Sequence, residues 1–446
     1  MSTVLHPTSD HSHVKGVLSR TKGWCPGALR PMQSGDGLIV RLRRTGGIYP
    51  RGLFAEVAIL AQRFGNGLVD LSARSNLQIR GVSEETLPGL HDALRALGLL
   101  DADAASEAVR NVIGSPLSGC DPSALIDGLS LVRALEDALV AAPHLHELPG
   151  KFGFLVDDGG SLPLDDIACD IRLKGVGGDD APLVELAIGG DARTASAVGL
   201  VRPSDAVSAA LALAHAFLSL RQALGPMPRR MAGLVSAVGL EAIVEAASKH
   251  SGLFGSPVIQ NGSSQHSATP PNTGSGPNVI GARTDFLGVG APFGRLTSAQ
   301  MKVIADVTAT DIRLTPWRAL LLPATGADAL PALSSAGLIT SPDDPRLCVA
   351  ACPGAPDCSS AEIETREAAS RLAPLAKSLG LTLHVSGCPK GCAHPKAAPV
   401  TLVGRAGRFD LVVDGRTDDL PTRRALAIDD IEGCLRDIAA SGKEER

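Results

Sequence analysis

The sequence predicts an α+β protein in which one strand–helix–strand unit occurs twice, beside two further α/β domains. Residues 37–43 have an apolar strand pattern, 52–64 a helical pattern, and 67–81 the pattern of a strand with a polar interruption. Residues 294–322 repeat this order and align on 50–79 with a small gap. In that alignment Arg295 falls on Arg51, Ala305 on Ala61, Leu314 on Leu71, Thr315 on Ser72 and Leu320 on Leu77. Two half-units are therefore expected to pair in space around one site.

The composition is that of a globular chain with sizeable cores. At 446 residues the length suits about three domains, and 44% of the residues are hydrophobic against 20% charged. The formal net charge of −5 argues against a general nucleic-acid binder, because no net positive field attracts phosphates. The apolar stretch 206–224 carries Ser208, His215, Ser219 and Arg221, which favours a buried helix over a membrane span.

Local composition also divides the chain. Residues 1–20 lack an apolar core, so they are expected to form a flexible leader and not a signal peptide. Ser, Gly, Pro and Asn dominate 251–278, which is expected to be a flexible linker. The expected folded units are 21–99, 100–250, 279–340 and 341–446. Without an export signal, the nine cysteines should meet a reducing compartment, so we expect a cytoplasmic protein whose clustered thiols bind metal.

Four cysteines form two pairs near the end of the chain. Five residues separate Cys352 from Cys358, three separate Cys388 from Cys392, and 29 lie between the pairs. Zinc sites prefer two to four residues between paired cysteines, and bacterial ferredoxins use two-residue gaps, so both are disfavoured. Four thiolates on one [4Fe–4S] cluster fit this spacing, with Lys390 nearby to tune its reduction potential. The other cysteines are expected to be packing residues: Cys25, Cys120, Cys169, Cys348 and Cys434.

These motifs resemble those of the sirohaem-dependent sulfite and nitrite reductases. The C-x5-C … C-x3-C spacing is similar to their cluster motif. Three further segments resemble the superfamily in the same order: "LSARSNLQIRG" (71–81), "VRNVIGSP" (109–116) and "ELPGKFGF" (147–154). The resemblance implies a reductase-like fold with two pseudo-symmetric ferredoxin-like half-domains and two further α/β domains around a central tetrapyrrole cleft. Transferred by motif, it also implies that Arg74, Arg110 and Lys151 are catalytic.

The chain departs from the reductase pattern where a small anion would bind. Gly153 stands at the second lysine of the Lys-x-Lys motif, Ser75 at a glutamine and Lys390 at a usual asparagine. Residues 23–43 and 312–323 instead resemble the precorrin-3B synthases, the oxygen-dependent branch of the superfamily. That resemblance implies a monooxygenase of aerobic cobalamin biosynthesis, which hydroxylates precorrin-3A at C20 and closes a γ-lactone. The alternatives are a sirohaem-dependent nitrite or sulfite reductase and a non-catalytic iron–sulfur electron carrier.

A polycarboxylated macrocycle needs cations around it, and both half-units supply them. Arginine pairs with carboxylates through two parallel hydrogen bonds. Arg74 and Arg80 alternate with apolar residues on one expected strand and are the favoured candidates. The full set of expected substrate-binding residues is Arg41, Arg43, Arg51, Arg74, Gln78, Arg80, Arg295 and Arg313.

A metal-free substrate leaves the activation of dioxygen to the protein. The resemblance implies a mononuclear non-haem iron beside the cluster, for which the weak candidate ligands are His144 and His146, with Glu147 beside them, and His384 or His394. No G-x-G-x-x-G loop follows a strand, since 288–294 has the wrong spacing. Electrons derived from NADH are therefore expected to arrive through an external electron-donor protein, with precorrin-3A and dioxygen as the other partners.

Overall fold

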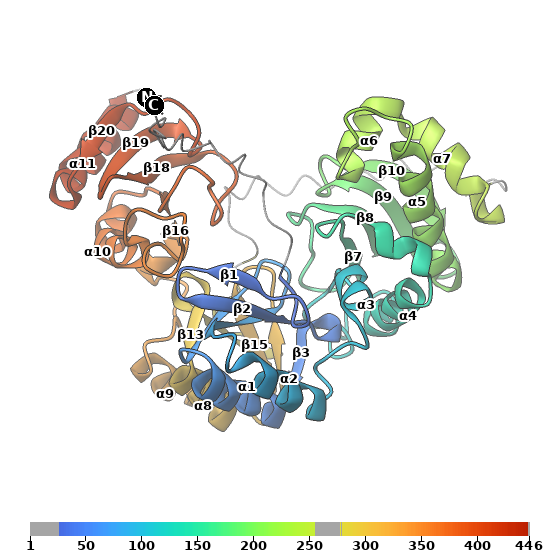
Figure 1. The fold of residues 1–446 in the computed structure, drawn as a ribbon, viewed down its shortest axis with the longest axis horizontal. Helices are drawn as coiled ribbons and strands as arrows, with labels where there is room; N and C mark the ends of the chain where they lie inside the picture. The colour runs from blue at the N-terminus through green and yellow to red at the C-terminus, as the bar shows by residue number, and fades with distance from the viewer. Residues whose placement is uncertain (1–25, 255–276, 278, 445–446) are drawn as a thin grey trace, which may run out of the picture.

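The computed structural model describes residues 26–254, 277 and 279–444, and this part of the chain forms four five-stranded sheets (Figure 1). Two sheets form a central pair. The other two belong to outer domains that stand on the same side of that pair (Figure 1). The expected leader, most of the expected linker and Cys25 lie outside the described residues.

Two half-units of equal design build the central pair. The first contains β1 (Met32–Ser34), β2 (Gly37–Leu42), β3 (Ile48–Pro50), α1 (Arg51–Phe64), β4 (Leu68–Leu71), β5 (Leu77–Val82) and α2 (Leu87–Ala96). The second contains β11 (Gly281–Ala282), β12 (Phe286–Gly290), β13 (Arg295–Thr297), α8 (Ser298–Val307), β14 (Asp311–Leu314), β15 (Ala319–Pro323) and α9 (Leu330–Ser335).

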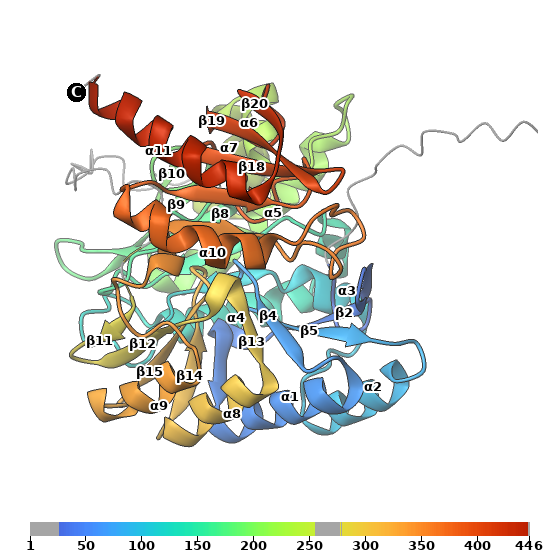
Figure 2. The same cartoon turned by 90° about the vertical axis from the view of Figure 1, so that its left-hand side faces the viewer.

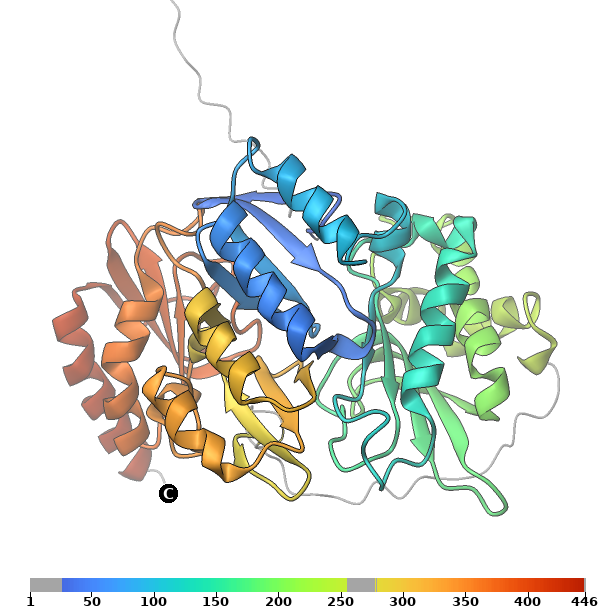
Figure 3. The ribbon, with the colours of Figure 1, turned by 90° about the horizontal axis from the view of Figure 1, so that it is seen from below.

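Each half-unit gives one strand to the sheet of the other. The strand order β1-β2-β5-β4-β13 places β13 of the second half beside β4 of the first, and the order β11-β12-β15-β14-β3 does the reverse. Val57 of α1, Leu296 of β13 and Ile304 of α8 share one buried core. Seen from below, α1, α2, α8 and α9 lie together on one face (Figure 3). The pseudo-symmetric pair predicted from the repeat is confirmed.

The structure corrects two details of the repeat. Residues 67–81 form two strands, β4 and β5, so Arg74 lies in the turn between them and only Arg80 lies on a strand. Arg295 was aligned on Arg51, but Arg51 begins α1 whereas Arg295 begins β13. The reason is helix length, because α1 has 14 residues and α8 has 10.

The two outer domains share a strand order. The first contains α3 (Ala104–Val109), β6 (Val112–Gly114), α4 (Gly128–Val140), β7 (Phe154–Asp157), β8 (Cys169–Val176), β9 (Leu183–Gly190), β10 (Ser196–Val201), α5 (Ala206–Arg221), α6 (Met231–Val238) and α7 (Leu240–Ser248). The second contains β16 (Val349–Ala351), α10 (Thr365–Ser378), β17 (Leu383–Ser386), β18 (Ala398–Arg405), β19 (Arg408–Gly415), β20 (Arg423–Leu426) and α11 (Ile428–Glu444). In each sheet three parallel strands are followed by two antiparallel ones, so the duplication extends to the outer domains.

Helices pack against each outer sheet. In the last domain α10 and α11 lie side by side in front of the strands (Figure 2), with Leu372, Ala376 and Leu435 in a core shared with the sheet. The stretch Pro203–Arg221 is long and apolar enough to cross a membrane. Ala209, Leu213 and Phe217 of α5 are nevertheless fully buried in the core of the first outer domain. Helix α5 is therefore a core helix of that domain.

Candidate functional site

The two cysteine pairs follow the ends of two adjacent parallel strands. Strand β16 pairs with β17 in parallel register, and Cys352 comes directly after β16. Cys388 comes two residues after the end of β17. Because the carboxyl ends of parallel strands meet at one edge of a sheet, the loops that carry all four cysteines start from the same edge.

The four thiols lie within electrostatic range of one another. Burial raises the pKa of Cys392, and the neighbouring Cys388, Cys352 and Cys358 raise it further. Burial also raises the pKa of Cys388; the backbone of Lys390 opposes this, and Cys358 and Cys352 add to it. Thiolates at this spacing repel one another, so bound positive charge stabilises them together.

The arrangement fits a cluster better than a single metal ion. Among the described residues, no three His, Cys, Asp or Glu side chains converge closely enough to hold one ion. In a [4Fe–4S] cluster each thiolate binds a different iron, so the sulfurs stand farther apart than they do around zinc. The four thiols interact electrostatically but do not converge on one metal-ion position, which matches that requirement.

Glycines let the two loops approach the sulfurs. The Gly387 N–H donates to Cys352 Sγ over 3.2 Å. A Cβ on Gly387 would lie 2.6 Å from the Cβ of Ala361. Gly354 has φ 72°, and a Cβ there would lie 2.6 Å from Thr365 Oγ1. A larger residue at either position would displace the loop, and a hydrogen bond to sulfur adjusts the reduction potential of a bound cluster.

The remaining described cysteines have other surroundings. Cys348 Sγ donates to Pro345 O over 2.9 Å, and its thiol packs against the core of the last domain. Cys120 and Cys169 donate to the carbonyls of Leu117 and Ile171, and Arg423 donates to Cys434 Sγ.

A buried charge network ties the cysteine loop to the central sheet. Asp70 on β4 accepts from Arg295 at 2.6 Å, Arg80 at 3.2 Å and Arg366 at 3.3 Å. Burial alone would raise the pKa of Asp70, but the hydrogen bond from Arg295 and the three guanidinium charges outweigh burial and lower it. Asp357, the residue before Cys358, pairs with Arg295. We call Asp36, Asp70, Asp357, Arg80, Arg295 and Arg366 the Asp70 network.

The network changes the interpretation of two expected substrate ligands. Arg80 is 2% exposed and also pairs with Asp36 at 2.5 Å and donates to Asp357 O at 2.7 Å. Arg295 divides its donors between Asp70 and Asp357. Their charges are already matched by protein carboxylates, so the structure gives both a role in holding the loop instead of a substrate.

Three more expected cations have protein partners. Arg313 pairs with Asp311 at 3.1 Å and donates to Ser118 O at 2.7 Å. Arg110, expected to be catalytic, lies between Asp101 at 2.7 Å and Glu136 at 3.2 Å. Buried Arg43 donates to Glu107 O.

The structure brings the other expected residues together in pairs. Arg74 Nη2 donates to Lys151 O over 2.9 Å, which joins the β4–β5 turn to the first outer domain. Arg41 Nη2 donates to Gln78 Oε1 over 2.9 Å across β2 and β5. Arg51 is exposed at the start of α1, 3.5 Å from Thr308 O.

The histidine candidates do not fit a mononuclear iron. His146 Nε2 lies 3.2 Å from Val140 O, and the His144 ring stacks on His215 with 5.6 Å between the ring centroids. The rings of His384 and His394 stand 5.7 Å apart at 64°. Burial first, and then His394 and the Arg318 cation, lower the pKa of His384 to about 4. The neighbouring Arg318 cation disfavours a ferrous ion there, and no carboxylate among the residues that the structure describes completes a three-ligand site with these rings.

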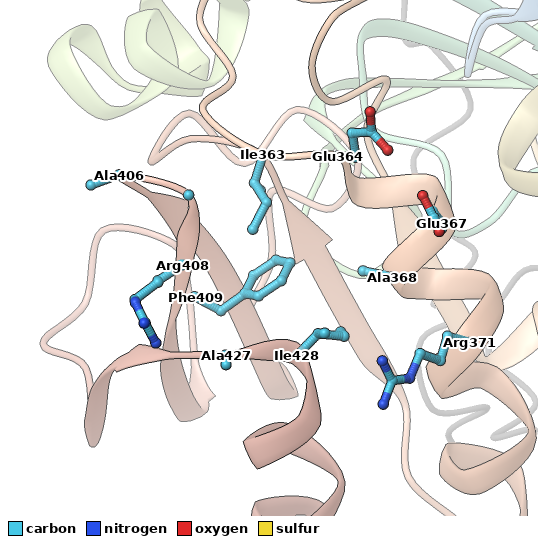
Figure 4. A pocket seen from close by; sticks show the side chains of 11 residues that line it. Ile363, Glu364, Glu367, Ala368, Arg371, Ala406, Arg408, Phe409, Ala427 and Ile428 are labelled. Atoms are coloured by element: carbon cyan, nitrogen blue, oxygen red, sulfur yellow. The ribbon is translucent and has the colours of Figure 1, made fainter.

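A pocket of about 480 Å³ opens elsewhere on the last domain, between α10, the β18–β19 turn and the start of α11. Figure 4 shows Phe409, Ile363 and Ile428 in its floor and Glu367 and Arg371 on the α10 side. Arg371 is paired with Asp429 at 2.5 Å. No cysteine lines this pocket, so it is separate from the candidate redox site.

Comparison with known families decides between the fold possibilities. The model of the nitrite/sulfite reductase ferredoxin-like half domain matches residues 30–97 and 281–336, and that of the nitrite and sulphite reductase 4Fe-4S domain matches 105–253. The chain belongs to the nitrite and sulfite reductase superfamily. The matches to the half-domain fall on the two half-units of the central pair.

Relatives within the superfamily include two kinds of enzyme. A precorrin-3B synthase from Sinorhizobium sp is 32% identical over 91% of this chain and 86% of its own length. A ferredoxin–nitrite reductase from Synechococcus elongatus is 28% identical over 85% of this chain and 78% of its own. The NirA protein of Mycobacterium tuberculosis has the same fold, with a TM-score of 0.70 at 20% identity over 90% of this chain and 81% of that one. The chain is an oxidoreductase of this superfamily.

In this superfamily member the two outer domains differ at the equivalent sheet edge. Ser115 follows β6 and Asp158 follows β7, where the second outer domain carries its cysteines. Ser118 Oγ donates to Asp158 Oδ2 over 2.7 Å, and the Asp158 N–H donates to Ser115 Oγ over 2.9 Å. Both hydrogen bonds join a serine hydroxyl to Asp158, one at its carboxylate and one at its backbone N–H, and paired thiols stand only at the edge in the second outer domain.

Sequence reasoning missed three residues beside the cysteines. Asp357 and Arg366 belong to the Asp70 network, and Arg318 lies near Cys352 and Cys392. For Asp357 the available signal was its place next to Cys358. For Arg318 the signal was the repeat, which aligns it with Ser75 in the other half-unit.

Proposed function

We propose that this chain is an oxygen-dependent precorrin-3B synthase of aerobic cobalamin biosynthesis, acting in the cytoplasm. One oxygen atom of dioxygen enters precorrin-3A at C20 as a hydroxyl. The other oxygen atom is reduced to water by two electrons and two protons. The ring A acetate then closes a γ-lactone. The 32% identity to a precorrin-3B synthase over 91% of the chain supports this proposal.

One structural observation at the expected substrate site favours this proposal over a reductase of sulfite or nitrite. Gly153 stands where the reductase motif has its second lysine, and a Cβ there would lie 2.9 Å from Asn111 Nδ2. That amide is fixed, because it donates to Phe152 O over 2.6 Å, and the Gly153 N–H donates to the Asp170 carboxylate over 2.9 Å. A lysine at this position would require the Asn111 amide to move and its hydrogen bond to Phe152 O to break. The site therefore has one cation fewer for sulfite or nitrite, and this favours a substrate that brings its own carboxylates.

The proposed substrate contacts come from two pairs, Arg74 with Lys151 and Arg41 with Gln78, none of whose members is fully buried. Arg74 and Lys151 would bind an acetate and stabilise the negative charge that develops on reduced oxygen. Arg41 and Gln78 would bind a second carboxylate. Arg110 touches Asp101 and Glu136, so we assign it to positioning the segment between α3 and β6.

The proposed cofactor is a [4Fe–4S] cluster held by Cys352, Cys358, Cys388 and Cys392. When bound, it supplies electrons singly. The electrons would derive from NADH and arrive through an external electron-donor protein. The residues around Arg74 would then hold the macrocycle so that C20 and the ring A acetate keep the geometry needed for lactone closure.

An isotope experiment tests the proposal. Anaerobically purified enzyme is mixed with precorrin-3A, a reductant and labelled dioxygen, and the mass of the product is measured by mass spectrometry. We expect one labelled oxygen to be retained as the C20 hydroxyl. Arg74→Ala should slow turnover about 10²- to 10³-fold, as for loss of one transition-state contact, whereas Arg371→Ala, on the surface of α10, should not.

The nitrite reductase relative defines the competing outcome. Its 28% identity over 85% of this chain makes a sirohaem-dependent reductase the second candidate. Inertness toward precorrin-3A, together with sirohaem-dependent reduction of nitrite or sulfite, would establish that candidate instead. A protein that exchanges electrons but transforms neither substrate would be an electron carrier.

A further inference from the structure

Arg318 occupies a strained turn that its counterpart fills with serine. In the β14–β15 turn, Arg318 has φ 58° and its N–H donates to Thr315 O over 3.3 Å. In the equivalent β4–β5 turn, Ser75 has φ 53° and its N–H donates to Ser72 O over 3.1 Å. A left-handed conformation is unfavourable for a long side chain, and such strain persists at sites where the side chain is needed.

The packing around this turn directs Arg318 to the cysteine-bearing domain. A Cβ on Gly294 would lie 2.7 Å from Arg318 Cδ, so the absence of a side chain there makes room for the arginine. The residue before it, Phe293, packs into the core of the last domain, which also contains Val349 and Ala351. Those two residues belong to β16, the strand that ends directly before Cys352. The space that Arg318 fills beside Gly294 therefore lies close to the end of β16, where the loop with Cys352 begins.

The charge of Arg318 acts on the thiols and is not neutralised directly. Burial lowers the pKa of Arg318, while Asp70, Cys352 and Cys392 act to raise it. Within the described residues, its guanidinium has no hydrogen bond or ion pair, whereas Arg295 and Arg366 each contact Asp70. Arg318 is thus a half-buried cation whose nearest opposite charge, apart from Asp70, would be cysteine thiolate.

We propose that the fixed positive charge of Arg318 raises the reduction potential of the cluster. A cluster with four thiolates gains a further negative charge on reduction, and a fixed nearby cation stabilises the reduced form. The two half-units have equivalent turns, and at the position with positive φ the turn near the thiols carries Arg318 where the other carries Ser75. This inference rests on the proposed cluster ligands and not on the identity of the substrate.

The test compares three variants of the purified holoenzyme. Arg318→Gln removes the charge, Arg318→Lys keeps it, and Arg371→Gln removes an equal charge from the α10 surface, where Arg371 pairs with Asp429 and Glu432. Iron and sulfide analysis first establishes the cluster content. A redox titration followed by electron paramagnetic resonance then gives each midpoint potential. We expect a more negative potential in Arg318→Gln, a value near that of the wild type in Arg318→Lys, and no change in Arg371→Gln.

Each outcome bears on the proposal. A fully loaded Arg318→Gln enzyme with the wild-type potential would overturn it. If Arg318→Gln loses the cluster, retention in Arg318→Lys would support the role of charge, and loss in both would show that shape matters instead. Failure of the ligand assignment is seen separately, as cluster iron that is retained when Cys352, Cys358, Cys388 or Cys392 is changed to serine.

Discussion

Cys352 and Cys348 are four residues apart, yet their sulfurs have different surroundings. Cys352 accepts an N–H from Gly387, whereas Cys348 donates to a carbonyl of its own turn. Burial raises the pKa of Cys348, and the other side-chain charges that act on it are Lys377 and Asp344, not the four paired cysteines. The surroundings of single residues thus separate thiols that can share a cluster from a thiol that packs.

Single Cys→Ser changes should reproduce this division. Serine at position 352, 358, 388 or 392 removes one iron ligand, so we expect loss or strong depletion of iron and acid-labile sulfide. Cys348→Ser is the matched control and should keep both near wild-type content. Equal depletion in the control would show that the first ligand is misassigned.

Asp70 is buried and pairs with buried Arg80 and with partly buried Arg295 and Arg366, so replacing its carboxylate by a neutral amide should destabilise the fold. Asp70→Asn leaves Arg80, Arg295 and Arg366 without their shared carboxylate, and breaking a buried pair costs about 3–5 kcal/mol. Urea unfolding should show a loss of that order. Asp343→Asn, which removes an exposed partner of Lys377, is the control and should change stability by less than about 1 kcal/mol. A similarly small loss of unfolding free energy in both variants would contradict this stabilising role of Asp70.

Residue types and spacing predicted that the two cysteine pairs come together, but not the partners of the arginines. The C-x5-C and C-x3-C spacings are local, and they can be found in one sequence. The contacts Arg295–Asp70 and Arg366–Asp70 join positions 225 and 296 residues apart. The neighbouring sequence does not distinguish an arginine that binds a substrate carboxylate from one that pairs with an aspartate far away in the chain. The carboxylate partners of Arg80 and Arg295 could therefore not be predicted from the sequence.

At the scale of elements, periodicity predicted the order of strands and helices and the repeat, but not the exchange of β3 and β13. A strand's alternation shows that one face is buried, and it does not name the neighbouring strand. Likewise the pattern of 67–81 predicts one strand with a polar interruption, because the turn at 72–76 contains no glycine or proline to mark it.

Strand β17 should make stability depend on pH through His384. Its side chain is fully buried, and both ring nitrogens lack hydrogen-bond partners within the described residues. Its folded-state pKa of about 4 lies below the ordinary 6.5, so the unfolded chain binds the proton first. Stability should therefore fall as the pH drops from about 6.5 toward 4, by about 2 kcal/mol between pH 7.5 and 5.

Denaturant unfolding of the wild type and His384→Leu at both pH values measures this contribution. The variant should lose that part of the pH dependence while other groups titrate unchanged. Identical pH dependence in both proteins would show that His384 is protonated as readily in the folded state as in the unfolded chain.

At the scale of the whole molecule, the shared core should make the two half-units interdependent. A fragment of residues 26–254 lacks β13, so the edge of β4 and the apolar surface that covers Leu296 and Ile304 are exposed. We expect it to aggregate, and co-expression with residues 277–446 to restore a soluble complex. Size-exclusion chromatography and thermal unfolding check this. A monomeric fragment that unfolds cooperatively near the full-length temperature would contradict it.

The exchanged strands also bear on the origin and synthesis of the chain. A lone ancestral half-unit would have had an unpaired sheet edge, and two identical copies could cover both edges only as a symmetric dimer. In one chain the two copies need not be identical, and here one outer domain carries thiols where the other carries serine and aspartate. The cost falls on translation. β4 ends at Leu71 and β13 begins at Arg295, so 223 residues must leave the ribosome before the first sheet is complete.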